Sequence, residues 1–218
     1  MKEITMKVAL FGATGLLGQD VIKQLLAHGH EVKALVRNPK KLAVDSSDIE
    51  VIQGDYFNPL DQEKALQYVD AVVSTIGPPT VTKGSPQPHQ YQAAMDSLIT
   101  LMEQKGVSRI VNVAGASATY QGENIQLSRH LIRWLMKMTV PVITPAKELE
   151  IERLRLSNLD YTIVRPPVIA DSAKGQFTAS NEKMKGTKVE RQQLAHFMVD
   201  VIDKSDWYGT LPFVANTP

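Results

Sequence analysis

Val8-Ala9-Leu10-Phe11-Gly12-Ala13-Thr14-Gly15-Leu16-Leu17-Gly18 is the stretch that decides the fold of this chain. Its four leading apolar residues predict a buried strand, and the spacing Gly-x-x-Gly-x-x-Gly predicts a tight turn that leads into a helix. One glycine permits the turn, one lets the backbone approach a pyrophosphate, and one lets the helix pack closely against the strand. The backbone N–H groups of such a turn bind phosphate groups.

The residues that follow support this interpretation. Leu17, Val21 and Leu25 recur at helical spacing, and Gly29 predicts the end of that helix. Residues 32–36 (Val-Lys-Ala-Leu-Val) then predict a second strand. A strand, a turn, a helix and a strand within about 30 residues are typical of a dinucleotide-binding unit. The alternative is a structural turn that binds nothing, and the agreement of spacing, position and flanks favours the binding site.

Apolar segments alternate with helical patterns as far as about residue 166, which predicts an α/β fold. Specifically, we expect a Rossmann-like, doubly wound parallel sheet. Residues 194–202 carry the apolar face of a further helix, and a last short strand is expected around 210–214. The expected strands of the sheet lie near residues 6–11, 31–36, 49–53, 70–76, 108–114 and 160–165.

Three stretches interrupt this alternation, at 77–90, 115–146 and 166–188, and proline and glycine punctuate all three. Each follows the carboxyl end of a strand, which is where an open α/β sheet binds its ligands. We therefore expect these late insertions to form a small lobe on the substrate side. No linker or repeat divides the chain, so residues 1–218 are interpreted as one NAD(P)-binding Rossmann domain.

Composition excludes several classes of protein. The 218 residues have a net charge of +1, which gives no electrostatic basis for binding nucleic acid or an anionic membrane. The absence of cysteine excludes disulfides, thiolate metal sites and a cysteine nucleophile, and no metal site is expected. No apolar run reaches the roughly 18 residues of a membrane span. We expect a cytoplasmic protein, either a monomer or a homodimer.

The residue after the second strand indicates which dinucleotide binds. NAD-binding folds usually place a carboxylate there, whereas this chain has Arg37, with Lys40 and Lys41 close behind. A guanidinium can hold a 2′-phosphate through two charge-assisted hydrogen bonds, so we expect NADP(H) to be preferred over NAD(H). The alternative is an exposed cationic turn without a ligand. Asp55, after the third strand, is expected beside the adenine rather than as a helix cap, because Asn58 is better placed to cap the next helix.

Four motifs together resemble a known family. They are the glycine turn, Val36-Arg37, Gly54-Asp55 and residues 159–167 (Leu-Asp-Tyr-Thr-Ile-Val-Arg-Pro-Pro). They are similar to the NAD(P)H-binding, NmrA-like group of atypical short-chain dehydrogenases/reductases, in particular the biliverdin reductase B/flavin reductase branch and bacterial NADH-flavin reductases. The resemblance covers nearly the whole chain, and the group ranges from reductases to cofactor-sensing regulators.

The resemblance also implies roles for individual residues. Lys147 would bond the nicotinamide ribose, although an exposed helix charge is the alternative, because acidic and basic residues surround it in the sequence. The remaining implied cofactor contacts are Gly12, Thr14, Gly15, Leu16 and Leu17 at the pyrophosphate, Arg37 and Lys41 at the 2′-phosphate, Asp55 and Tyr56 at the adenine, Thr75, Ile76 and Gly77 along the middle, and Val113 towards the nicotinamide. Pro166 is expected as a further cofactor contact.

The general acid of ordinary short-chain dehydrogenases is missing. None of the six tyrosines is followed by lysine four residues later. The catalytic candidates that remain are Lys147 and Ser117, the latter shifted from the Ser-Ser pair of many relatives.

Reduction of an isolated ketone benefits from a placed acid, whereas a flat conjugated acceptor such as a flavin or quinone delocalises the charge. We therefore expect an NADPH-dependent reductase that transfers hydride to a planar conjugated acceptor. Its pocket would be walled by 77–79, 117–120 and 166–169. The alternative is a non-catalytic NADP(H)-binding redox sensor.

Overall fold

The computed structural model describes residues 5–45, 47–77 and 85–217. Its centre is a sheet of six strands, and every neighbouring pair in that sheet is parallel. The order β3-β2-β1-β4-β5-β6 is that of a doubly wound Rossmann fold, as the sequence predicted. The strands are β1 (Lys7–Phe11), β2 (Glu31–Val36), β3 (Glu50–Gln53), β4 (Ala71–Ser74), β5 (Arg109–Val113) and β6 (Asp160–Val164).

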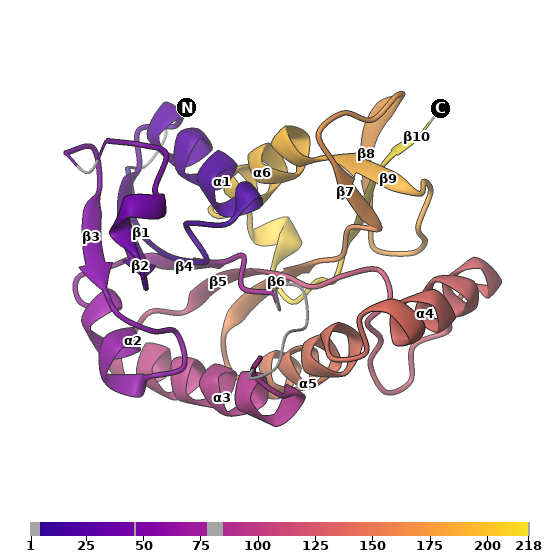
Figure 1. Cartoon of the computed structure of the whole chain (residues 1–218), viewed down its shortest axis with the longest axis horizontal. Helices are drawn as coiled ribbons and strands as arrows, with labels where there is room; N and C mark the ends of the chain where they lie inside the picture. Colours follow the sequence, from indigo (N-terminus) through magenta and orange to yellow (C-terminus); the bar gives the residue numbers. More distant parts are fainter. Residues whose placement is uncertain (1–4, 46, 78–84, 218) are drawn as a thin grey trace.

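Helices cover both faces of this sheet (Figure 1). Helices α1 (Leu16–Ala27) and α6 (Arg191–Asp200) pack on one face, whereas α2 (Pro59–Ala65), α3 (Pro88–Lys105) and α5 (Ile143–Leu156) pack on the other. The alternation of side chains along β1 shows how both faces are filled. Val8 and Leu10 belong to the core under α1 and α6, while Ala9 and Phe11 belong to the core under α3 and α5.

The direction of winding changes between β1 and β4, and this change positions the site. After β1 the chain moves to β2 and β3 on one side, then crosses back to β4 on the other side of β1. The loops at the carboxyl ends of β1 and β4 therefore leave in opposite directions. In open α/β sheets the crevice between such loops is the ligand-binding position.

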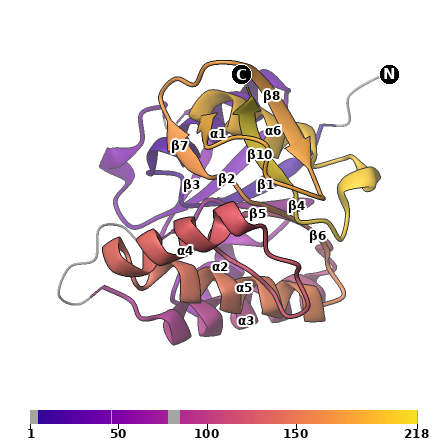
Figure 2. The same cartoon turned by 90° about the vertical axis from the view of Figure 1, so that its right-hand side faces the viewer.

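A second, smaller sheet lies beside α6 (Figure 2). Its four strands are β7 (Val168–Ala170), β8 (Gln176–Ser180), β9 (Lys188–Glu190) and β10 (Phe213–Thr217), in the order β7-β9-β10-β8. The late lobe is thus a sheet rather than loops alone. The last strand was expected around 210–214 and instead begins at Phe213, because only isolated bridges from Thr210 and Phe213 reach β6 before β10 pairs with β8.

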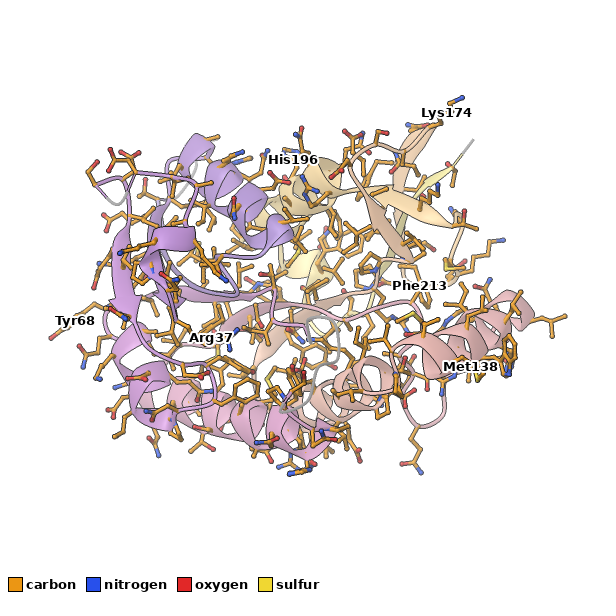
Figure 3. The ribbon with its side chains drawn as sticks, viewed as in Figure 1. Arg37, Tyr68, Met138, Lys174, His196 and Phe213 are labelled. Carbon is orange, nitrogen blue, oxygen red and sulfur yellow. The ribbon has the colours of Figure 1, made fainter. Side chains whose placement is uncertain are left out.

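Helix α4 (Leu127–Thr139) projects from the body beside α5 (Figure 1). Its apolar stripe faces away from the protein, with Leu127 87%, Leu131 61%, Trp134 58% and Met138 70% exposed. Figure 3 shows Met138 at the outer side of this helix. Within the described residues, no helix is long and apolar enough to cross a membrane.

Candidate nucleotide-binding site

The glycine turn after β1 can be built only with glycine at two positions. Gly12 has φ +91°, and a Cβ there would lie 2.5 Å from the Thr75 side-chain oxygen. A Cβ on Gly18 would lie 2.2 Å from the Gly12 carbonyl oxygen. Gly12 therefore allows the carboxyl ends of β1 and β4 to lie close together, and Gly18 allows α1 to pack directly against the turn.

The start of α1 has the properties of a phosphate site. Gly15 is the N-cap residue in an extended conformation, no side chain caps the helix, and no acidic residue lies in its first turn. The first N–H groups of a helix have no partner within the helix and carry its positive dipole end. With twelve residues in α1, this end of the helix fits the pyrophosphate of a dinucleotide.

A cleft of about 220 Å³ opens in front of the turn, between the ends of β1 to β4 and helix α3. Nine of the cofactor-binding residues expected from the sequence line this cleft. They are Gly12, Thr14, Gly15, Arg37, Asp55, Tyr56, Thr75, Ile76 and Gly77, and they are joined by Leu35, Val36, Gly54, Phe57, Pro86 and Tyr91.

Arg37 stands at the outer end of the cleft, directly after β2 (Figure 3). Its side chain is exposed and has no hydrogen bond or ion pair with another described residue. Lys41 ends the short 3₁₀ helix Pro39–Lys41 nearby and is also exposed. This end of the cleft therefore offers the Arg37 guanidinium to an anionic group, whereas Lys41 does not line the cleft.

Asp55 lies in the cleft wall and does not cap a helix. Its Oδ1 accepts a hydrogen bond from the Phe57 N–H at 3.1 Å, which forms a local turn. Its own N–H donates to Asp61 Oδ2 at 3.1 Å. Asn58 caps α2 instead, with its Oδ1 accepting from the Leu60 N–H at 3.0 Å, as the sequence predicted.

Two tyrosines close the inner wall of the cleft, and both hold their protons firmly. Tyr56 is 5% exposed, and its ring packs edge-on against Phe11. Burial and then the negative charge of Glu150 raise the pKa of Tyr56 well above its usual value. The same two causes raise the pKa of Tyr91 to about 12, although Arg37 opposes them. Neither phenol is suited to donate a proton at neutral pH.

Lys147 is buried beside the inner end of the cleft, with 3% of its surface exposed. Its ammonium donates to the Ile76 carbonyl at 2.5 Å and to Glu150 Oε2 at 2.7 Å. Asn112 Nδ2 donates to the same carboxylate oxygen at 3.3 Å. An exposed helix charge, the alternative for Lys147, is therefore wrong.

Glu150 was not predicted as a site residue, although its helical spacing indicates that it is buried. Lys147 and Glu150 occur at the same helical spacing as the buried Ile151 and Leu154 and share their stripe on α5.

Residues 12–205 of this chain match the sequence model of a protein family described as NAD(P)H-binding. The chain belongs to the NAD(P)H-binding family. This membership confirms the resemblance to the atypical short-chain dehydrogenases/reductases, and it agrees with the placement of the cleft at the glycine turn.

Several proteins of known sequence or structure are similar to this chain over most of its length. The protein YwnB of Bacillus subtilis is 26% identical over 180 residues, which are 83% of this chain and 80% of YwnB. Anaerobilin reductase ChuY of Escherichia coli O157:H7 superposes with a TM-score of 0.78 at 21% identity, over 96% of this chain and 97% of ChuY.

A short-chain dehydrogenase/reductase of Veillonella parvula, solved with NADP, gives a TM-score of 0.74 at 17% identity, over 98% and 95% of the two chains. Several other relatives are longer proteins, and the chain spans between 26% and 60% of the length of three of them.

Four further residues expected to bind the cofactor do not line the cleft in this NAD(P)H-binding fold. Leu16 is 69% exposed at the start of α1, whereas Leu17 is 9% exposed and packs in the core below. Val113 is buried in the same core. Pro166 is buried beyond β6, where its carbonyl accepts from the Ala116 N–H at 2.8 Å.

Ser117 is also withdrawn from the cleft. It is 4% exposed, and its hydroxyl lies 2.9 Å from that of Thr144, at the start of α5. Of the other expected wall residues, Pro78 and Pro79 lie outside the described residues. Thr119 and Tyr120 line a separate groove of about 650 Å³ along the outer side of α5. Ser117 is therefore buried, whereas Thr119 and Tyr120 lie at a surface away from the cleft.

A buried charge cluster fixes this stretch to the lobe. Glu123 accepts hydrogen bonds from Arg129 at 2.7 Å and from Arg165 at 2.5 Å, and both guanidiniums are at most 2% exposed. Both also lie over the ring of Phe213, at 4.6 and 3.8 Å from its centre. The described residues contain no group of three or more His, Cys, Asp or Glu side chains that could hold a metal ion.

Proposed function

We propose that this protein is an NADPH-dependent reductase that transfers hydride to a planar conjugated acceptor such as a flavin or a quinone. The single observation that carries this proposal is one cleft with two different cations. Arg37, which has no hydrogen bond or ion pair with another described residue, lines its outer end. Lys147 is held beside its inner end by Glu150 and the Ile76 carbonyl.

The chain's own residues would bind the cofactor across the switch point. The first N–H groups of α1 would bind the pyrophosphate, together with Thr14 and Gly15. Arg37 and Lys41 would bind the 2′-phosphate of the adenosine, and Asp55 would lie beside the adenine. Lys147 would bond the nicotinamide ribose. When bound, the reduced nicotinamide supplies the hydride.

The preference for NADPH over NADH rests on the end of β2. A guanidinium without a partner among the described residues loses no ion pair with them when it binds a phosphate. Charge-assisted hydrogen bonds of this kind contribute about 1.5 to 3 kcal/mol each. The ribose of NADH has an uncharged 2′-hydroxyl at this position, so it would interact more weakly with the Arg37 guanidinium.

The choice of acceptor rests on proton supply. The tyrosines at the cleft hold their protons, with the pKa of Tyr91 raised to about 12. Ser117 bonds Thr144 rather than facing the cleft. Lys147 is a charged donor beside the inner end. An acceptor that spreads the new charge over a conjugated system needs no stronger acid, and holding donor and acceptor together can supply a large part of the rate enhancement.

The relatives support a reductase of this kind. One solved structure with the same fold is an anaerobilin reductase, and another contains NADP. Val168 and Ile169, from the stretch expected to wall the acceptor pocket, are 58% and 40% exposed, but they do not line the cleft.

The test combines binding with turnover. Calorimetry with NADPH and NADH is expected to show tighter binding of NADPH. Mixing protein, NADPH and riboflavin or benzoquinone is expected to remove the near-ultraviolet absorbance of the reduced cofactor. Equal affinities would overturn the preference, and an inactive protein across a broad panel of acceptors would overturn the reductase assignment.

The exposed face of α4 favours a second candidate function. An apolar stripe of four large side chains that faces solvent is typical of a protein–protein contact. A non-catalytic NADP(H) sensor that reports to a protein partner would use such a face. Tight binding of NADPH without turnover of any acceptor would support the sensor over the reductase.

A further inference from the structure

We propose that Glu150 is a positioning residue that, with Asn112, holds the Lys147 ammonium for the nicotinamide half of the dinucleotide. This inference rests on the proposed binding of NADPH. It assigns a role to two buried residues that line no part of the cleft themselves.

The cost of the ion pair is the first argument. The side chains of Lys147 and Glu150 are 4% and 1% exposed. Removing two charges from water costs several kcal/mol for each ion, and well-packed apolar residues often serve stability equally well in such places. The pair is therefore poorly explained by stability alone.

The surrounding polar atoms are the second argument. Buried polar atoms in folded proteins nearly always have a hydrogen-bond partner. Here the described residues offer none to four atoms of one cluster. These are Glu150 Oε1, Asn112 Oδ1, Ser74 Oγ and Tyr56 Oη.

These four atoms belong together in the fold. Asn112 bonds the carboxylate of Glu150, and the charge of Glu150 raises the pKa of Tyr56. Ser74 is the register partner of Asn112 on the neighbouring strand, so both side chains point to the same face of the sheet. A cluster with so many unpaired groups is arranged for something other than packing.

The position along the sheet identifies what Lys147 would meet. Arg37 follows β2, on one side of β1, whereas Ile76 follows β4 and Asn112 lies in β5, on the other side. A dinucleotide whose adenosine is held by Arg37 and whose pyrophosphate lies on α1 must place its other half over β4 and β5.

The hydrogen bonds of Lys147 leave it one donor for this purpose. An ammonium has three N–H groups. One donates to Glu150 and one to the Ile76 carbonyl, which is part of a residue in the cleft wall. The carboxylate and the carbonyl thus fix the direction of the third N–H, which can donate to a hydroxyl of the nicotinamide ribose.

Two ligands separate this role from a general effect on the fold. NADPH occupies both halves of the cleft, whereas adenosine 2′,5′-bisphosphate carries only the adenosine with its phosphates. Calorimetry of Glu150→Gln is expected to show NADPH binding weakened about tenfold, which is the loss of one charge-assisted hydrogen bond. Binding of the bisphosphate should stay within about twofold of the parent, by the usual independence of distant sites.

Glu152→Gln is the matched control, since Glu152 is an exposed carboxylate on the same helix. It should bind both ligands like the parent. Glu150→Asp, which keeps the charge on a shorter side chain, should recover part of the lost affinity for NADPH. Equal weakening of both ligands by Glu150→Gln, or unchanged binding of NADPH, would overturn the positioning role.

A double variant covers the case in which Glu150→Gln does not fold. Lys147→Met with Glu150→Leu removes both charges, so no buried ion is left alone. We expect it to fold, to bind the bisphosphate like the parent and to bind NADPH about tenfold more weakly. Normal binding of NADPH by this variant would overturn the inference alone. A parent protein that binds neither ligand would overturn the proposed function as well.

Discussion

The two ends of the cleft hold their cations in opposite ways. Arg37 is exposed and has no partner among the described residues, whereas Lys147 is 3% exposed and has a carboxylate and a carbonyl as partners. A free surface cation can bind a ligand without weakening the fold. A buried cation with fixed partners can give direction to a ligand, but its loss also disturbs the fold. In the proposed function, Arg37 would therefore contribute to the affinity for the ligand, and Lys147 would contribute to its orientation.

The largest effect is expected when the buried end is broken. Lys147→Met leaves the Glu150 carboxylate buried without its cation, so the free energy of unfolding should fall by about 3 to 5 kcal/mol. Urea denaturation measures this, and the addition of Glu150→Leu should recover most of the loss. A loss of less than about 1 kcal/mol in the free energy of unfolding is typical of surface ion pairs. Such a small loss would show that the two ends differ less than their burial indicates.

A smaller effect is expected from the turn between the two ends. Gly18→Ala puts a Cβ 2.2 Å from the Gly12 carbonyl oxygen, so α1 or the turn must move. We expect a loss of roughly 2 kcal/mol in stability, the usual cost of overpacking. Binding of NADPH and of the bisphosphate should weaken together, because both depend on the phosphate site.

Removal of the exposed cation should affect binding alone. Arg37→Ala is expected to weaken NADPH binding about tenfold, by the loss of a charge-assisted contact, and to leave NADH binding unchanged. Its free energy of unfolding should stay within about 0.5 kcal/mol of the parent. Thermal denaturation and calorimetry test both points. A clear loss of stability would mean that Arg37 is part of the fold rather than a free ligand group.

At neutral pH the smallest effect is expected for Tyr91. Its pKa depends on the charges of both Glu150 and Arg37. Its pKa is about 12 when folded against 10.0 normally, because of burial and Glu150, with Arg37 opposing. The folded state thus keeps this proton more firmly, so stability is fully present below pH 10 and is lost as the pH rises from 10 towards 12. Tyr91→Phe should flatten this decline in pH-dependent urea denaturation. An equally steep decline in the variant would show that other groups cause it.

Much of the fold could be predicted from the sequence because the deciding signals are local. The turn at Gly12 to Gly18 and the apolar runs of β4 and β5 each follow from neighbouring residues. Arg37 could be placed in the same way, since the residue after β2 lies at the edge of the crevice whatever surrounds it.

The rest depends on contacts between distant residues. Strands β7, β8 and β9 have three to five residues and are mostly exposed or half exposed, so they carry no clear period. The buried strand β10 pairs with β8 from more than thirty positions away. The withdrawal of Ser117 needs Thr144, 27 residues later. The cluster of Glu123 joins Arg129, six residues away, with Arg165, 42 residues away. Helical spacing alone could have identified Glu150.

The place of β10 between β8 and β9 has a consequence for synthesis of the chain. All six strands of the large sheet precede residue 165, so they can pair as soon as they leave the ribosome. Arg165, by contrast, bonds the Leu211 carbonyl and lies over Phe213. At roughly 5 to 20 residues per second, these partners arrive some seconds later. Until then the Arg165 guanidinium lacks these partners, and the small sheet is the last part of the fold to be completed.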